Sequence, residues 1–123
     1  MPVNGTARWP VELRLKSAEK LLEITFDDGS RFHLPAEYLR VESPSAEVQG
    51  HGAGQKTLVP GRAHVGIIGL EPVGNYAVRI TFDDLHDTGI YSWSYLYQLG
   101  VEHDMRWREY LDALAANGLS REP

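Results

Sequence analysis

The sequence predicts a single α+β domain: a small, mostly antiparallel β-sheet with a duplicated strand-turn-strand-helical-turn unit, followed by two C-terminal helices. Three observations support this fold class. Alternating apolar and polar residues, the pattern of half-buried strands, recur through the first two thirds of the chain. The segment 24–28 (Ile-Thr-Phe-Asp-Asp) returns unchanged at 80–84. Apolar residues at helical spacing then follow Ser92.

Length and composition limit the architecture and the partners. The chain has 123 residues, fewer than the roughly 150 of an average domain. We therefore expect one domain at 11–118, with an N-terminal extension at 1–10 and a tail at 119–123. The net charge of −5 argues against a nucleic-acid partner. No apolar run approaches the ~18 residues of a membrane span, and no signal-peptide pattern follows Met1, so we expect a cytoplasmic protein without a membrane partner.

The first unit reads as three strands and a helical turn. Alternation predicts strands at 11–16, 21–26 and 31–34. The turn at 27–30 (Asp-Asp-Gly-Ser) is a strong hairpin signal, because Asp-Gly tolerates the positive φ of a tight turn. Pro35 suits the first position of a helical turn that we expect to reach Leu39.

Residues 42–62 are predicted to form a long loop. The segment holds four glycines, two prolines and few apolar anchors. Loops of this length are commonly functional or mobile, and we expect this one to become ordered on a partner. Residues 50–57 imitate a phosphate-binding loop, but Gln55 separates the glycines from Lys56, so a flexible loop is the better interpretation.

The second unit is predicted to repeat the first. We expect strands at 64–70 and 76–82, joined by a turn at 72–75, and a short strand after the second acidic turn. Tyr38-Leu39 matches Tyr95-Leu96 after a one-residue insertion. Two similar β units are the preferred interpretation, and chance similarity of two strand-turn segments is the alternative.

Two helices are predicted at the C-terminal end. Ser92 is a plausible N-cap of the first, and Gly100 lies just past its expected end. The second is expected from about 104 to 117, ended by Gly118. Its apolar stripe consists of Trp107, Tyr110, Leu111 and Leu114.

The densest polar cluster follows the second copy of the repeat. Asp83, Asp84, His86 and Asp87 offer carboxylates and an imidazole, which suit Fe(II), Mn or Zn, so a weak iron-type site is one hypothesis. A facial triad needs a second histidine, which His33 or His51 would have to supply. The alternative is a solvated hairpin turn, in which aspartate is favoured for its turn geometry.

Aromatic residues alternate with polar ones directly after this cluster, which suggests either a stacking surface or part of the core. The core is preferred, because aromatic side chains bury large areas and no basic surround favours nucleic acid. These residues are Tyr91, Trp93, Tyr95 and Tyr97.

Four segments together give the sequence a family resemblance. They are residues 26–30, 34–40, 70–76 and 82–93, which extend over most of 11–100. With them the chain resembles the γ-butyrobetaine hydroxylase-like N-terminal domain family, as a stand-alone bacterial member. The resemblance implies a domain that is also found joined to 2-oxoglutarate/Fe(II) dioxygenases and to ATPases that carry iron–sulfur clusters.

The resemblance also implies where a zinc site would lie. In the dioxygenases the domain binds zinc through a Cys-x-Cys-x-x-Cys segment and a later histidine. Laid on this chain, these positions are Ser43, Ser45, Val48 and His86. Valine cannot coordinate zinc and serine is a poor ligand, so we expect the family's zinc site to be lost here.

The resemblance leads to one functional expectation with two rivals. We expect a non-catalytic accessory or binding domain, not an enzyme, whose protein partner is an iron–sulfur carrier ATPase or an iron enzyme. Apart from the weak iron of the hypothesis above, we expect no cofactor. The first rival is an iron-type metal-binding protein with its ion near His86. The second is a small enzyme that uses residues 42–62 as a lid.

Overall fold

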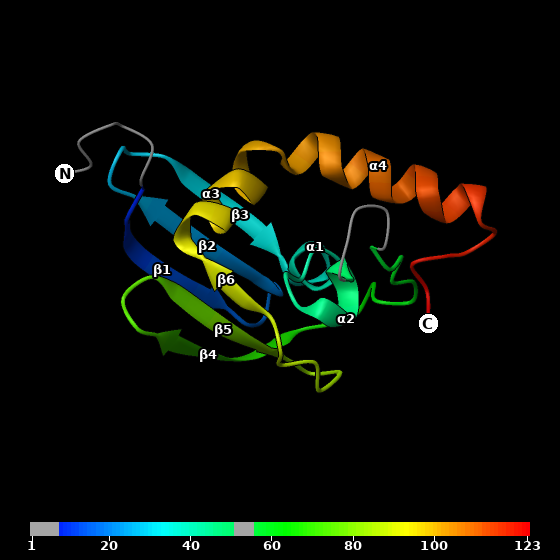
Figure 1. Ribbon diagram of the computed structural model, residues 1–123, viewed down its shortest axis with the longest axis horizontal. Coiled ribbons are helices and arrows are strands. Elements are labelled where there is room, and N and C mark those ends of the chain that lie inside the picture. The colour runs from blue at the N-terminus through cyan, green and yellow to red at the C-terminus, as the bar shows by residue number, and fades with distance from the viewer. Residues whose placement is uncertain (1–7, 51–55) are drawn as a thin grey trace.

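The computed structural model describes residues 8–50 and 56–123 (Figure 1). The fold class is α+β, as predicted, and the strands form two three-stranded antiparallel sheets. The strands are β1 (Pro10–Lys16), β2 (Leu21–Phe26), β3 (Arg31–Pro35), β4 (Ile67–Val73), β5 (Ala77–Phe82) and β6 (Ile90–Ser92). The helices are α1 (Ala36–Val41), α2 (Ala46–Gln49), α3 (Trp93–Val101) and α4 (His103–Ala116).

The sequence repeat corresponds to two equivalent structural units. Each is a three-stranded antiparallel sheet, β1-β2-β3 or β4-β5-β6, whose last strand leads directly into a helix, α1 or α3. The acidic turns that join the second and third strands share their hydrogen bonds. In the first turn these bonds are Gly29 N–Phe26 O (3.0 Å), Phe26 N–Ser30 O (2.8 Å) and Ser30 N–Asp28 Oδ1 (2.9 Å). The equivalent bonds of the second turn, in the same order, are Leu85 N–Phe82 O (2.9 Å), Phe82 N–His86 O (2.9 Å) and His86 N–Asp84 Oδ1 (3.1 Å).

One hydrophobic core lies between the two units, because the central strand of each sheet points alternate side chains inward. Burying such apolar side chains is the main force that holds the sheets together. The inward residues are Leu22, Ile24 and Phe26 of β2 and Val78, Ile80 and Phe82 of β5, all between 0% and 3% exposed.

The helices of the two units are tied by reciprocal hydrogen bonds. Tyr38 of α1 donates its hydroxyl to the Leu99 carbonyl of α3 at 2.7 Å. Tyr95 of α3 donates its hydroxyl to the Glu42 carbonyl, at the end of α1, at 2.5 Å. Each acceptor lies four residues after the tyrosine of its own helix, so the same position is used twice.

The helical prediction is confirmed at one end of α3 and wrong at the other. Ser92 caps the helix, since its hydroxyl accepts the Tyr95 N–H at 3.1 Å. Gly100 lies inside α3, not past its end. A Cβ atom there would come within 2.4 Å of the Phe32 ring, so glycine is required for close packing. In α4, Leu111 is 39% exposed and falls outside the expected apolar stripe.

The strand prediction is also shifted in the second unit. β4 begins at Ile67 rather than 64 and continues through Pro72 and Val73, which were expected to form the turn. Residues 71–73 pair with residues 77–79 of β5, so the ladder extends up to the short turn at 74–76.

Residues 42–62 are better anchored than expected. The few apolar residues of the segment do anchor it, because Val48 of α2 and Val59 are 2% and 8% exposed and pack against α4 residues Tyr110 and Leu114. Residues 51–55 of the expected loop, with His51, lie outside the described residues.

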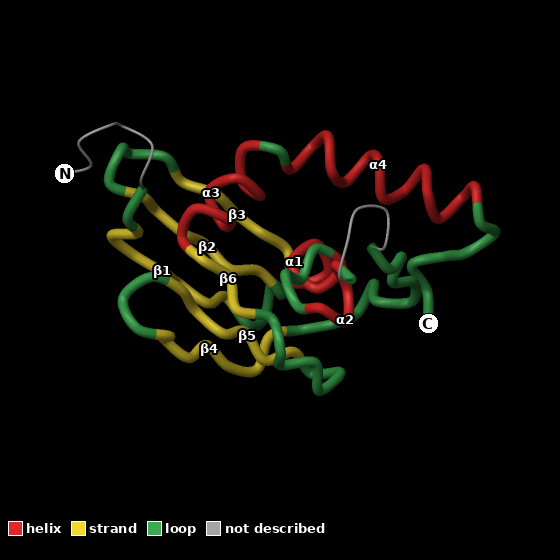
Figure 2. Tube along the Cα trace, viewed as in Figure 1, coloured by secondary structure: helices red, strands yellow, loops and turns green. Residues whose placement is uncertain are grey.

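The C-terminal tail turns back from the far end of α4 (Figure 2). The Ser120 and Arg121 carbonyls accept main-chain N–H groups from residues 61 and 63 at 2.9 and 3.0 Å. Arg121 also makes a bidentate pair with the buried Glu37 carboxylate at 2.7 and 2.8 Å. None of the described helices is both long and apolar enough to cross a membrane.

Candidate functional site

Three polar side chains meet in the interior beside the second acidic turn. The turn between β5 and β6 places His86, and the link from α1 to α2 places Ser43 and Ser45. His86 Nε2 lies 2.9 Å from Ser43 Oγ and 3.4 Å from Ser45 Oγ, and the two hydroxyls are 3.2 Å apart. All three residues are buried. The cluster therefore connects two segments that lie more than 40 residues apart in the sequence.

The surroundings of His86 favour its neutral form. Burial, and after it the positive charge of Arg40, lower the pKa of His86 below its ordinary value of 6.5. A neutral imidazole has one donor and one acceptor nitrogen, so Nε2 can either donate to or accept from the Ser43 hydroxyl. This form suits a hydrogen-bonded interior and is also the form that binds metal ions.

Asp84 is held by two guanidinium groups next to this cluster. Arg40 Nε and Arg62 Nε each donate to Asp84 Oδ2 at 2.8 Å. Partial burial would raise the pKa of Asp84, but the hydrogen bonds from Arg40 and from the His86 N–H outweigh it and lower the pKa. The Arg40 side chain is 10% exposed. The carboxylate thus neutralises a buried cation.

The predicted metal residues are neighbours in the sequence, but in the structure their side chains do not surround one point. The His86 ring faces the serines, Asp84 faces the arginines, and Asp83 and Asp87 are exposed. His33 belongs to the other sheet, where it lies 2.6 Å from Glu23 and its hydrogen bond lowers the pKa of that carboxyl. Across residues 8–50 and 56–123, no group of three His, Cys, Asp or Glu side chains is placed to hold a metal ion.

The donors at the family's zinc positions do not fit zinc. Ser43, Ser45 and His86 do meet, as the resemblance implies, but their polar atoms are bonded to one another. The fourth position is Val48, whose buried side chain has no donor atom. One imidazole with two neutral hydroxyls lacks the thiolates that complete a structural zinc site.

The aromatic residues after the turn serve the core. Tyr91 is fully buried and donates its hydroxyl to the Leu39 carbonyl, and burial raises its pKa. Trp93 is half-buried and donates its indole N–H to the Asn75 carbonyl at 2.9 Å. Tyr95 and Tyr97 also pack against the main core.

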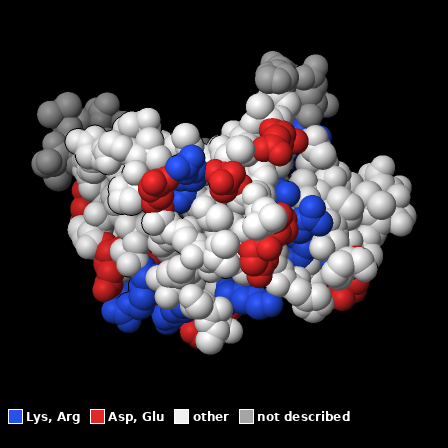
Figure 3. Space-filling view, turned by 90° about the horizontal axis from the view of Figure 1, so that it is seen from below, with Lys and Arg blue, Asp and Glu red and all other residues white. Residues whose placement is uncertain are grey.

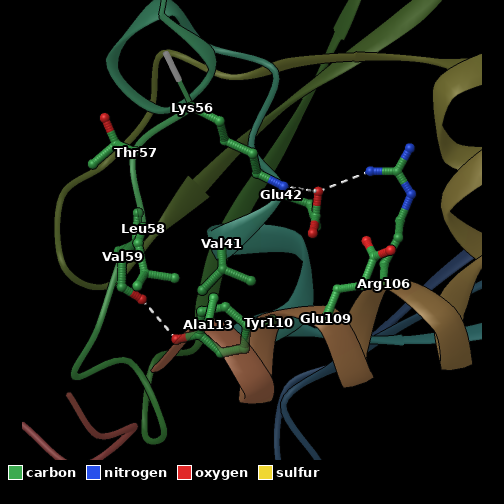
Figure 4. Close-up of a pocket in the computed structure, with 10 residues that line it drawn as sticks. All are labelled: Val41, Glu42, Lys56, Thr57, Leu58, Val59, Arg106, Glu109, Tyr110 and Ala113. Atoms are coloured by element: carbon green, nitrogen blue, oxygen red, sulfur yellow. Dashed lines mark hydrogen bonds and ion pairs between the residues drawn. The ribbon is translucent and has the colours of Figure 1, made fainter. Parts of the chain in front are cut away.

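A small pocket lies between α4, residues 56–59 and the end of α1 (Figure 4). Its volume is about 200 Å³. Glu42 lies on its wall, paired with Lys56 at 2.7 Å and Arg106 at 2.9 Å. The Tyr110 hydroxyl donates to the Val59 carbonyl at 2.6 Å across the apolar end. Sequence reasoning missed this pocket, because its walls come from three distant segments with no common motif.

One face of the molecule carries charges of both signs. The face in Figure 3 shows acidic and basic side chains interspersed, with no continuous field of one sign. Nucleic-acid binding normally needs a basic stripe or patch, so this face offers no electrostatic footprint for it.

Comparison with known proteins places the chain among small domains of similar fold. The family described as gamma-butyrobetaine hydroxylase-like, N-terminal, matches residues 13–97. One protein with an NMR solution structure is 46% identical over 94% of this chain and 91% of its own, with a TM-score of 0.82. A second protein with an NMR solution structure is 47% identical over 100% of this chain and 92% of its own, with a TM-score of 0.83. A crystallised protein of unknown function from Acidithiobacillus ferrooxidans, assigned to the DUF971 family, is 37% identical over 74% of this chain and 91% of its own, with a TM-score of 0.63. No curated protein matches the chain.

Proposed function

Because the chain belongs to the gamma-butyrobetaine hydroxylase-like N-terminal domain family, we propose that it is a non-catalytic accessory domain that binds a protein partner. The partner class that we propose is an iron–sulfur carrier ATPase or an iron-dependent enzyme. The choice of class comes from the resemblance, since domains of this type occur joined to such proteins. A separate chain of this type would then act in trans on the same machinery.

The observation that supports a binding role is the internal use of the polar groups. His86 is bonded to Ser43, and Asp84 is bonded to Arg40 and Arg62. A general base or nucleophile must reach a substrate atom at hydrogen-bond distance. These groups instead reach other parts of the same chain, so they fix the α1–α2 link against the second acidic turn.

The pocket beside α4 supports the same proposal through its size. Small-molecule sites usually have volumes of about 300–1,000 Å³, whereas this pocket has about 200 Å³. A cavity of this size suits one side chain of a partner protein. The paired Glu42 carboxylate at its wall and the Lys56 side chain, 45% exposed, give it a polar rim.

Affinity capture from the native host, with the whole chain as bait, tests the proposal. Captured proteins are identified by mass spectrometry, purified and titrated against the chain by calorimetry. We expect a stoichiometric complex with an iron–sulfur carrier ATPase or an iron enzyme, at micromolar affinity or better. The proposal fails if no protein of these classes binds the purified chain, or if the chain alone turns over a substrate.

One observation favours the alternative, an iron-type ion near His86. Burial lowers the pKa of the His86 imidazole and so favours its metal-binding neutral form, in the same turn as the carboxylates of Asp83 and Asp87. Addition of Mn(II) to ¹⁵N-labelled protein separates the two functions. An ion at this place broadens the signals of residues 83–88 at substoichiometric metal, and His86→Gln removes the effect, whereas non-saturating broadening over the whole acidic surface excludes the site.

A further inference from the structure

Leu85 lies at the tip of the connection between β5 and β6. With 80% of its surface accessible, it is the most exposed large apolar residue of the part of the chain that the structure describes. The connection projects from the lower edge of the sheets in Figure 1. The φ angle of Leu85 is +71°, in the left-handed region that a bulky residue rarely adopts.

The first unit shows what this position needs for folding. Gly29 occupies the same place in the matched turn, with φ of +88° and the same main-chain hydrogen bond to the strand before it. A Cβ atom at Gly29 would meet no atom within 4 Å. Glycine therefore makes the turn without strain, and the fold does not require a side chain there.

Leucine at this position carries two unfavourable features at once. Its backbone is strained relative to glycine, and its apolar side chain is exposed to water. Residues held in rare conformations often lie at functional sites. A leucine that is exposed in the free protein gains about 1.5–3 kcal/mol when a partner buries it. Folding alone therefore does not account for a leucine at this position.

The charges around Leu85 indicate what it contacts. Asp83 and Asp87 lie two positions before and after it, both are exposed, and neither forms an ion pair with another described residue. The adjacent Asp84 is already paired with Arg40 and Arg62. We propose that Leu85 anchors this domain in an apolar pocket with a Lys- and Arg-lined rim on a different protein. Complementary charge of this kind steers the encounter and fixes the orientation. The inference rests on the proposed binding function and names the surface that performs it.

Calorimetry with the purified partner tests the anchor. Leu85→Gly copies the matched position in the first turn, and we expect it to bind about 10- to 100-fold more weakly, as the loss of one buried leucine predicts. Val101→Ser is the control, because Val101 is also an exposed apolar residue (64%) but ends α3. It should bind like the wild type. The double variant Asp83→Lys/Asp87→Lys should also weaken binding, and by less at high salt.

The outcomes separate this inference from the proposed function. If the wild type binds a partner and Leu85→Gly binds equally well, the inference is wrong and the proposed function stands. If the wild type binds no protein, both are wrong. If the wild type forms a dimer in sedimentation experiments and Leu85→Gly is a monomer, the surface binds a second copy of this chain. That result would overturn the proposal that Leu85 binds a different protein. A variant that unfolds more easily than the wild type shows a structural role for Leu85 and also overturns the inference.

Discussion

The two β units share their backbone but hold their second aspartate in different ways. In the first unit, Asp28 accepts a hydrogen bond from the Tyr97 hydroxyl of α3 at 2.6 Å, which is the main reason that its pKa falls to about 2. In the second unit, Asp84 accepts from the Arg40 guanidinium of α1 at 2.8 Å. Each unit's helix therefore binds the other unit's turn. The difference teaches that main-chain bonds define the turn, while the partner of the carboxylate can change.

The largest expected effect tests whether the two units contribute equally to one core. Phe26→Ala and Phe82→Ala remove matched rings that are 1% and 0% exposed. Each should lower the free energy of unfolding by about 3–5 kcal/mol, because a large cavity forms in a closely packed interior. Urea unfolding followed by tryptophan fluorescence measures both. Losses that differ by more than about 2 kcal/mol would show that one unit dominates the core.

A smaller effect tests the difference between the two aspartates. Asp84→Asn keeps an oxygen for the turn but leaves the buried Arg40 guanidinium without its anion. We expect a loss of about 2–3 kcal/mol, less than the roughly 3–5 kcal/mol of a fully buried pair, because the Asp84 side chain is 22% exposed. Asp28→Asn keeps the same turn oxygen and faces the neutral Tyr97 hydroxyl and the Arg8 guanidinium at 3.1 Å, whose side chain is 27% exposed. Because exposed ion pairs are worth only about 0–1 kcal/mol, its loss should be clearly smaller. Equal losses in urea unfolding would contradict the distinction.

A third test uses the one acidic turn that contains a histidine. His86 lies where the first turn has Ser30. Since its folded pKa is lowered, the unfolded chain binds more protons below pH 6.5, and the free energy of unfolding must fall as the pH drops from there. One such group contributes at most about 1.4 kcal/mol per pH unit.

His86→Ser copies the first turn and should flatten the dependence of stability on pH between 7 and 5. Some slope remains, because burial also lowers the pKa of His103. Thermal unfolding at several pH values measures the slope, with His64→Gln, a change at an exposed histidine, as the control. An unchanged slope in His86→Ser would mean that the ring already titrates as in the unfolded chain.

The sequence predicted most of the fold because its signals are local. The repeated segment at 24–28 and 80–84 indicated two matched units, and Ser92 indicated the start of α3. The role of Gly100 was predicted wrongly. Glycine is needed there because of the close Phe32 ring, which lies 68 positions earlier in the chain. The pair of Arg121 with Glu37 depends on contacts 84 residues apart, which no local pattern encodes.

Two parts of the candidate site could be inferred from the sequence, each for a different reason. The meeting of Ser43 and Ser45 with His86 followed only from the family's zinc positions, since nothing local joins the segments. The acidic residues around His86 stand out as a polar run in the sequence, but the sequence could not show that Arg40 and Arg62 neutralise Asp84. Whether a carboxylate is paired with a cation depends on arginine side chains from other segments of the chain.

The smallest expected effect compares the tips of the two turns by exchanging their residues. Leu85→Gly relieves a left-handed leucine, which costs about 1–2 kcal/mol, but glycine gives the unfolded chain about 0.5–1 kcal/mol of extra entropy. We therefore expect the free energy of unfolding to rise by up to about 1 kcal/mol. Gly29→Leu should lower it by a similar amount, because Gly29 adopts φ of +88° in open space. Opposite signs in urea unfolding show that the two turns are equivalent for folding. If both variants lose stability, Leu85 supports its own turn, and the two tips differ in structure as well as in sequence.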